Sequence, residues 1–261
     1  MSKVYVGVGH GGTDPGAVGF LVEKEVNLKM ALACRDYLVK RGVSVLMARE
    51  DDSSVTLTES IDKCNAYNPD LALECHNNAG KGNGFEVYHS LNGVTGKILA
   101  KNIEEEVIKL GQNSRGLKTR KGSTGSDYYG FIRLTVCPAV ICEGAFVDHP
   151  EDYKMIDSDE KCKAFGEAYA RGVLKTLGIE DTVIVTPPDE TEPAGNKGYL
   201  VKITTDALNI RRGPGINFEK VGMITDRGVY TIMEKKEADG YTWGRLKSGA
   251  GWIALKYTKK L

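Results

Sequence analysis

A short valine-rich run near the amino terminus, Val4 to Val8, ends just before a histidine in a glycine-rich turn. A short apolar run bounded by turn residues predicts a buried β-strand, so His10 would stand at the carboxyl end of that strand. Ligands in open α/β sheets bind beyond the carboxyl ends of the strands, and glycine lets the backbone pass close to a bound group. The stretch therefore predicts either a ligand site or a plain turn with an incidental histidine. Possible metal ligands at the ends of other strands would favour the ligand site.

Strand-like and helix-like segments alternate through the first two-thirds of the chain. Helices are indicated by apolar spacing and by end signals such as Thr56 with Glu59, which form a capping box. The predicted helices are residues 23–41, 56–68, 94–110 and 160–177. The predicted strands after the first are residues 43–48, 70–76, 84–89, 130–135 and 138–142, and residues 111–127 are predicted to be a long basic loop. The alternation predicts an α/β domain with a largely parallel sheet and helices on both faces.

Two later apolar strands run into His76 and Glu143, side chains that can bind a metal ion or transfer a proton. If these strands are parallel neighbours of the first strand, His10, His76 and Glu143 meet above one edge of the sheet. Glu23 stands at the start of the first predicted helix, where acids are favoured by the helix dipole, and it can reach the same place.

Two histidines and one carboxylate form a ligand set for a catalytic zinc ion, which keeps one position open for water. Zinc lowers the pKa of that water toward about 7 and polarises a carbonyl group. A second carboxylate that does not bind the metal can then take the proton of the water and pass it to a leaving nitrogen. Glu143 is the candidate for this role. The chain has no HExxH pattern, so a helix-borne zinc protease site is excluded.

The carboxyl-terminal region differs from the rest in composition. Residues 179–197 are rich in proline, glycine and acids, which predicts a linker. Residues 198–261 contain short, closely spaced β-like runs, which predict a small all-β barrel. This last region carries 12 Lys and Arg against 6 Asp and Glu, whereas the whole chain carries 35 of each. The basic excess suits an anionic polymer as partner, although a solvated basic face would have the same composition.

No apolar run is long enough to span a membrane, and no signal-peptide pattern precedes the first strand. We therefore expect synthesis in the cytoplasm and no membrane insertion. Nucleic acid is not among the expected partners. The six cysteines include no CxxC pair, which favours buried, reduced thiols over a disulfide framework or a cysteine zinc site.

Four motifs together resemble a known family. GHGGTDPGA, EKEVNL, DLALECHNNAG and PAVICEGAFVDHPED occur in the order typical of zinc-dependent N-acetylmuramoyl-L-alanine amidases of the Amidase_3 type, which are wall hydrolases of bacteria and phages. The resemblance covers residues 3–177 and implies a catalytic domain of residues 1–178 with a twisted sheet flanked by helices. It implies peptidoglycan as substrate, with cleavage of the amide between the lactyl group of N-acetylmuramic acid and L-alanine. It further implies Zn2+ as cofactor, His10, Glu23 and His76 as its ligands, and Glu143 as the catalytic acid/base.

Some positions near these motifs have a less definite role. Glu74 stands where such enzymes often have a small or apolar residue, and strand alternation places it on the face of His76. It is predicted to orient the imidazole or to contact substrate, with a plain surface acid as the alternative. Asn78 is predicted to shape the loop or contact substrate, and Arg115 of the basic loop is predicted to contact substrate.

Glu25 lies close enough to Glu23 for the alignment to slip by one acid. We assign the ligand role to Glu23 because the Glu-Lys pair leads the family motif and Asn27 follows Glu23 by one helical turn.

The carboxyl-terminal region resembles a bacterial SH3 domain in the segments LNIRRGPG and WGRL and in GAGWI. In wall hydrolases such domains resemble cell-wall anchors, so a wall ligand is expected, either a peptide cross-bridge or an anionic polymer. Arg211, Tyr241 and Tyr257 are predicted to contact it, whereas Trp243 and Trp252 are predicted to pack in the core. The implied domains are residues 1–178, a linker of residues 179–197, and residues 198–261.

The modular layout resembles a phage or prophage endolysin, which acts at the bacterial wall after release by a holin. A leaderless bacterial autolysin and a chain whose leader was removed are the alternatives. Two other functions compete with the amidase: a zinc peptidase that cuts the stem peptide or cross-bridge, and a non-catalytic wall-binding protein with a decayed hydrolase domain. The presence of all four chemical residues disfavours the latter.

Overall fold

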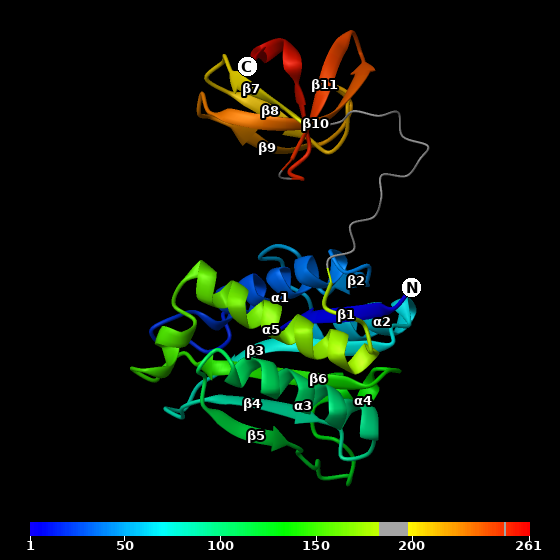
Figure 1. The fold of residues 1–261 in the computed structure, drawn as a ribbon, viewed down its shortest axis with the longest axis vertical. Helices are drawn as coiled ribbons and strands as arrows, with labels where there is room; N and C mark the ends of the chain where they lie inside the picture. Colours follow the sequence, from blue (N-terminus) through cyan, green and yellow to red (C-terminus); the bar gives the residue numbers. More distant parts are fainter. Residues whose placement is uncertain (183–197, 248) are drawn as a thin grey trace. The chain divides into compact units, whose positions relative to one another are not determined.

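The computed structural model describes residues 1–182, 198–247 and 249–261, which belong to two compact units, residues 1–185 and 186–261 (Figure 1). Each unit has its own sheet and its own buried core. Residues 183–197, which make up most of the predicted linker, lie outside the described residues. At the end of the described part of the first unit, Asp181 accepts hydrogen bonds from the Tyr37 hydroxyl and pairs with Arg41.

The amino-terminal unit is a mixed α/β fold around one six-stranded sheet. Its strands are β1 (Lys3–Val8), β2 (Ser44–Met47), β3 (Leu71–Asn78), β4 (Phe85–His89), β5 (Ser114–Lys118) and β6 (Ala139–Phe146). Its helices are α1 (Glu23–Val39), α2 (Leu57–Tyr67), α3 (Val94–Ile108), α4 (Gly130–Leu134), the 3-10 helix η1 (Asp152–Met155) and α5 (Asp159–Leu177). The strand order is β2-β1-β3-β6-β4-β5. Of the strand pairs in this six-stranded sheet, only β4–β6 is antiparallel, so the prediction of a mostly parallel sheet is confirmed.

Side chains alternate between the two faces of the sheet, and each face has its own core. Helices α1, α3 and α5 lie across one face, where they bury residues such as Val6 and Leu73 (Figure 1). On the opposite face, Tyr5 packs with Ile61 of α2 and Phe131 of α4. Helices therefore cover both faces, as the sequence predicts.

The face under α2 and α4 changes character along its strands. In β3, Ala72 belongs to the apolar core, whereas Glu74 and His76 follow on the same face at two-residue spacing. The strand register places Glu143 of β6 beside His76, and Glu86 of β4 beside Glu143. On this face, the first residues of β3 and β6 thus belong to the apolar core. The later residues of both strands place ionisable side chains in a row.

Two predicted elements of this unit are wrong. Residues 130–135 are predicted as a strand, but residues 130–134 form helix α4. The run is too short for its spacing to distinguish a helix from a strand, and the burial of the adjacent Phe131 and Ile132 fits either, because the strands of this sheet are also buried on both faces. The predicted loop 111–127 contains β5, a polar edge strand that pairs with β4.

Other local predictions agree with the structure or need small corrections. The capping box of α2 is present, with Thr56 Oγ1 accepting from the Glu59 amide at 3.2 Å and Glu59 accepting from the Thr56 amide at 2.8 Å. Strand β6 runs on to Phe146, so Glu143 lies within the strand and not at its end. All six cysteines are free thiols, as predicted, and five of them are buried. Among the described helices, none combines the length and apolar character needed to cross a bilayer.

The carboxyl-terminal unit is all-β. Its strands are β7 (Tyr199–Ile203), β8 (Leu208–Arg211), β9 (Lys220–Ile224), β10 (Val229–Ala238), β11 (Tyr241–Leu246), β12 (Trp252–Ala254) and β13 (Thr258–Lys260), with the 3-10 helix η2 (Leu255–Tyr257). They form an antiparallel sheet in the order β13-β7-β10-β11-β12-β8-β9. The sequence did not predict β9 and β13, and an SH3-like barrel stays a prediction. Trp243 and Trp252 are 3% and 7% exposed, which confirms their place in the core.

Candidate active site

Three side chains from separate elements converge at the carboxyl ends of β1 and β3. His10 follows β1, Glu23 is the first residue of α1 and His76 lies in β3. His10 Nε2 is 3.3 Å from Glu23 Oε2, and His76 Nδ1 is 2.9 Å from Glu23 Oε1. One ligand atom from each residue lies within 4.8 Å of the other two, a spacing that can hold a single metal ion. Glu25, the alternative acid, is exposed.

Glycines let these three side chains meet. His10 itself has a φ of +60°, a left-handed conformation that is uncommon outside glycine and often found at functional sites. A Cβ atom at Gly9 would lie 2.2 Å from His76 Cε1, and one at Gly16 would lie 2.6 Å from both Glu23 Oε2 and His10 Cδ2. The glycine-rich turn is therefore required by the close approach of the first loop to His76.

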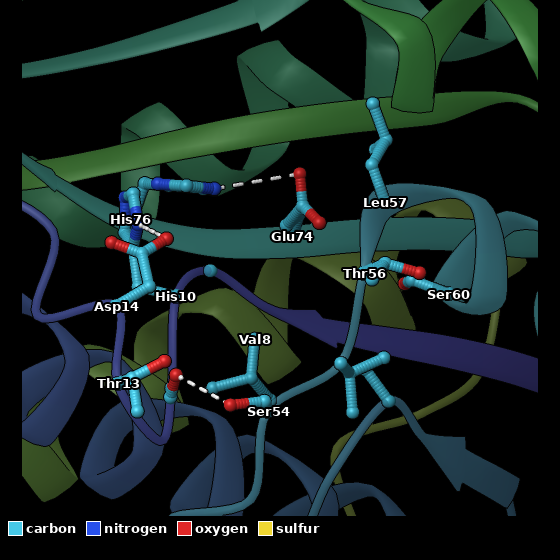
Figure 2. Close-up of a pocket in the computed structure, with 14 residues that line it drawn as sticks. Val8, His10, Thr13, Asp14, Ser54, Thr56, Leu57, Ser60, Glu74 and His76 are labelled. Atoms are coloured by element: carbon cyan, nitrogen blue, oxygen red, sulfur yellow. Dashed lines mark hydrogen bonds and ion pairs between the residues drawn. The ribbon is translucent and has the colours of Figure 1, made fainter.

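Each histidine has a carboxylate at the ring nitrogen that does not face Glu23. Figure 2 shows these carboxylates, Asp14 and Glu74, beside the two histidines. Asp14 Oδ2 lies 2.8 Å from His10 Nδ1, and Glu74 Oε2 lies 3.5 Å from His76 Nε2. An acceptor at the outer nitrogen fixes the tautomer and keeps the inner nitrogen available to a metal. The predicted position of Glu74 on the face of His76 is confirmed. The sequence reasoning missed Asp14, although it lies in the same turn as His10.

Glu23 is only 3% exposed, yet its surroundings favour the ionised form. Its carboxylate accepts hydrogen bonds from the backbone amides of Ala17 at 2.8 Å and Asn77 at 3.1 Å. Burial favours the protonated form, but hydrogen bonds from His10 and His76 outweigh burial and hold the pKa of Glu23 well below its usual range. The hydrogen bond to Glu23 raises the pKa of His10, and hydrogen bonds raise the pKa of His76 against the effect of burial. A metal ion would take the place of the protons that these pairs share.

Two further side chains fix the backbone that carries His10. Asn27, one turn after Glu23, donates to the Gly9 carbonyl at 3.1 Å and to Glu23 Oε1 at 3.2 Å. Arg49, which is 3% exposed, donates from Nε to the His10 carbonyl at 2.7 Å. Sequence reasoning did not assign Arg49 a role. The signal for it was an arginine placed directly after a predicted strand.

Glu143 lies beside the three ligand candidates on the same face of the sheet. It is the register neighbour of His76 on one side and of Glu86 on the other. Burial, opposed by His76 and reinforced by Glu23, Glu86 and Glu74, raises the pKa of Glu143 to about 7. A carboxyl group that titrates near neutral pH can accept a proton in one step and donate it in another.

Glu86 is a site residue that the sequence reasoning missed. It is 5% exposed, and it accepts from Asn78 Nδ2 at 2.9 Å and from Arg115 Nε at 2.8 Å. Asn78 and Arg115, two of the three residues predicted to contact substrate, therefore hold a buried carboxylate next to Glu143, and Arg115 does so from β5 and not from a loop. The available signal was an acid between two apolar residues of a predicted strand.

A cleft of about 380 Å³ opens beside the two histidines (Figure 2). His10 and His76 form one side of it, and the start of α2 forms the other. Its lining combines aliphatic and hydroxyl side chains, among them Val8, Ala48, Ser54, Val55, Thr56, Leu57 and Ser60. Clefts lined in this way bind organic ligands through apolar contact and a few hydrogen bonds.

The residues predicted to contact the wall lie in the carboxyl-terminal unit and share one groove. Arg211, Tyr241 and Tyr257 all line a groove of about 390 Å³, together with the indole of Trp243. The Arg211 guanidinium also donates from Nη1 to the Phe218 carbonyl at 2.7 Å. The structure thus brings the three residues together, although their ligand stays a prediction.

The amino-terminal unit is similar to known wall amidases. Residues 4–175 match Amidase_3, the N-acetylmuramoyl-L-alanine amidase family. The chain is 32% identical over 184 residues to the N-acetylmuramoyl-L-alanine amidase CwlM of Bacillus licheniformis, covering 69% of this chain and 70% of that protein. It is 30% identical over 213 residues to the endolysin of Bacillus phage SPP1, covering 77% of this chain and 76% of that protein.

The fold is similar to that of a solved amidase domain. The catalytic domain of CwlV, an N-acetylmuramoyl-L-alanine amidase from Bacillus (Paenibacillus) polymyxa var. colistinus, superposes with a TM-score of 0.62 at 24% identity. The similarity covers 69% of this chain and all of that domain. The shared fold therefore corresponds to the α/β unit.

Proposed function

This chain belongs to the N-acetylmuramoyl-L-alanine amidase family, and we propose that residues 1–178 form a zinc-dependent catalytic domain. The reaction is hydrolysis of the amide between the lactyl group of N-acetylmuramic acid and L-alanine of the stem peptide. The observation that carries the proposal is the convergence of His10, Glu23 and His76, with Glu143 beside them.

The donor atoms fit zinc in kind and in arrangement. Two imidazole nitrogens and one carboxylate form a ligand set of catalytic zinc sites, which keep a position open for substrate or water. His10 would bind through Nε2 and His76 through Nδ1, because these are the nitrogens that face Glu23. Asp14 and Glu74 would hold the outer nitrogens, and such partners raise the basicity of the ligand.

When bound, the zinc ion would supply Lewis-acid polarisation of the scissile carbonyl and an activated water. Glu143 would accept the proton of the attacking water and deliver it to the nitrogen of L-alanine as the amide bond breaks. Its pKa of about 7 suits both steps. Glu86, held by Asn78 and Arg115, adds negative charge beside Glu143 and so favours the protonated form needed for the second step.

The test is digestion of purified peptidoglycan by the zinc-loaded chain, with and without chelator, followed by mass analysis of the products. Free stem peptides that begin with L-alanine, together with peptide-free glycan, are expected, and a chelator should abolish them. Cleavage inside the peptides would move the function to a zinc peptidase. No release from several wall types would favour a wall-binding protein without activity, and activity that survives chelation would overturn the metal assignment.

We also propose that residues 198–261 form an SH3-like wall-binding domain and that the chain acts at the bacterial wall as an endolysin. The support is the similarity to the phage SPP1 endolysin and the groove that Arg211, Tyr241 and Tyr257 share. Production of the chain in a susceptible host with and without a holin tests the second part. Lysis only in the presence of the holin is expected, and lysis without it would point to an autolysin.

A further inference from the structure

A second groove of the carboxyl-terminal unit, of about 480 Å³, is lined by three lysines. They are Lys235 of β10, Lys256 of η2 and Lys260 of β13, all exposed. The rings of Tyr199 and Tyr241 line the same groove. We call this the lysine groove, and its lining contains no acidic residue.

The three lysines are held by aromatic rings instead of carboxylates. Lys235 Nζ and Lys260 Nζ lie 4.8 Å and 4.9 Å from the centre of the Tyr199 ring, and Lys256 Nζ lies 5.5 Å from that of Tyr241. Such contacts orient an ammonium group without neutralising its charge. Among the described residues, none of the three has a carboxylate within ion-pair distance.

The six acids of residues 198–261 bond to groups other than the three lysines. Each bonds to a group of its own region: Asp206 to Arg227, Glu219 to Arg212, Glu234 to Arg245, Asp226 to Tyr230, Asp239 to the Ile216 amide and Glu237 to Thr242. Only Glu237 contacts a residue of the groove, because Thr242 is part of the lining. Within residues 198–247 and 249–261, no acid therefore forms an ion pair with a lysine of the groove.

Protection of a sheet edge does not account for this arrangement. Lysines on an edge strand discourage pairing with other chains, and β13 is such a strand. Lys256, however, lies in a 3-10 helix and not in a strand, and Lys235 lies on β10 beyond the end of its pairing with β7, where β10 still pairs with β11. In β13 the register also places Lys260 beside the buried Val201 and Lys259 beside the exposed Lys202, so only Lys260 faces the groove.

We propose that the lysine groove binds a linear phosphodiester polymer of the cell wall, of the teichoic acid class. A row of ammonium point charges fits phosphates that repeat along a flexible chain, whereas paired recognition of carboxylates favours arginine. The lysine groove has no arginine, while the neighbouring groove has Arg211. This inference rests on the proposed function in one respect: the chain is proposed to act at the bacterial wall, so the polymer is expected to be a wall component.

The test is binding of soluble poly(glycerol phosphate) to the full chain, measured by fluorescence anisotropy of the labelled polymer at several salt concentrations. The groove variant carries Lys235→Gln, Lys256→Gln and Lys260→Gln. The matched control carries Lys202→Gln, Lys220→Gln and Lys259→Gln, which remove the same charge from exposed positions outside the groove. Emission from the buried Trp243 and Trp252 verifies that both variants fold.

We expect the groove variant to bind at least about tenfold more weakly and to lose part of the salt dependence, because fewer counterions are released. The control should change by less than about twofold. Equal weakening of both variants, or no binding by the unmodified chain, would overturn the site. Equal affinity for polyglutamate of matched charge would overturn the phosphodiester assignment.

Walls provide a second readout. Sedimentation with walls before and after removal of teichoic acid by hydrofluoric acid should show loss of the groove-dependent binding; retention would overturn the proposal. Cleavage of a soluble muropeptide is measured on the same preparations. A chain that binds the polymer but cleaves nothing contradicts the proposed function alone, and a chain that cleaves but does not bind contradicts this inference alone.

Discussion

The two units of this protein treat polar groups in opposite ways. Among the described residues, every polar or charged side chain that is buried belongs to the amino-terminal unit. Glu23 is an example, at 3% exposure with bonds to two histidines and two backbone amides. In residues 198–261 the charged side chains are partly or fully exposed, including the three lysines of the lysine groove.

Because of this difference, charged side chains have different roles in the two units. A buried charge has lost its hydration, so it needs fixed partners, and those partners also fix its geometry and pKa. An exposed charge keeps most of its hydration and acts additively and in a salt-dependent way. Single substitutions should therefore have large effects at the catalytic site and small, graded effects in the carboxyl-terminal unit.

The largest expected effect is that of Glu143→Gln. Glutamine keeps the shape but cannot take a proton from water, so turnover should fall by about 10²–10⁴-fold. The measurement is release of stem peptides from purified peptidoglycan, with zinc content and wall binding as controls that stay unchanged. Turnover within tenfold of the unmodified chain would remove Glu143 from the mechanism.

Next in size are the carboxylates behind the ligand histidines. Asp14→Asn and Glu74→Gln should each weaken zinc binding by about 10–100-fold, because the outer nitrogen of His10 or His76 loses its charged acceptor. Competition with a zinc chelator measures this. Asp62→Asn, at an exposed position of α2, is the matched control. Wild-type affinity in both variants would show that the two carboxylates are surface acids.

Part of this site could be predicted from the sequence because it depends on strand ends. His10, His76 and Glu143 each follow or end an apolar run, and parallel pairing of neighbouring strands brings such positions together. The prediction depended on β3 and β6 being neighbours, which no local pattern specifies. That β3 and β6 are neighbours follows only from the family resemblance and from the structure.

The contacts of Glu86 and Arg49 could not be predicted because they depend on tertiary pairing. Glu86 and Arg115 meet because β4 runs antiparallel to β6 and β5 adds to its outer edge. Edge strands are often short and polar, so the sequence of β5 was predicted to be part of a loop. Arg49 donates to the carbonyl of His10. This contact depends on the conformation of the turn, and residue spacing in the sequence does not indicate it.

The stability of the metal-free protein should depend on pH through Glu143. The pKa of Glu143 is raised from 4.5 to about 7, so between these values the folded state holds the proton more tightly than the unfolded chain. Stability from this group is therefore lost as pH rises through that window. Above pH 7 the ionised carboxylate should cost about 2 kcal/mol, allowing for its partial exposure.

Urea denaturation of metal-free protein at pH 5 and pH 8 measures this cost. Glu143→Gln should be more stable than the unmodified chain at pH 8, and the difference should shrink at pH 5. The unmodified chain provides the reference for other titrating groups, including His10 and His76. A variant that is less stable at pH 8 would mean that the Glu143 carboxylate is compensated in the folded state.

The smallest effect tests the comparison directly with two ion pairs of equal length. Arg171 and Glu106 in the first unit are 3.0 Å apart with side chains 26% and 9% exposed, and Arg212 and Glu219 in the second are 3.0 Å apart at 70% and 67%. Double-mutant cycles with glutamine should give a coupling of about 1 kcal/mol or more for the first pair and below about 0.5 kcal/mol for the second.

Salt gives the decisive control for that cycle. At 1 M salt the Debye length falls to about 3 Å, so coupling between the exposed Arg212 and Glu219 should vanish while most of the coupling between Arg171 and Glu106 persists. Because the two distances are equal, the pairs differ in burial and in the second ion pair that Glu106 forms with Lys109, a residue that is kept in every variant of the cycle. Equal couplings with equal salt dependence would mean that exposure does not separate the units energetically, and the graded binding inferred for the lysine groove would lose its physical basis.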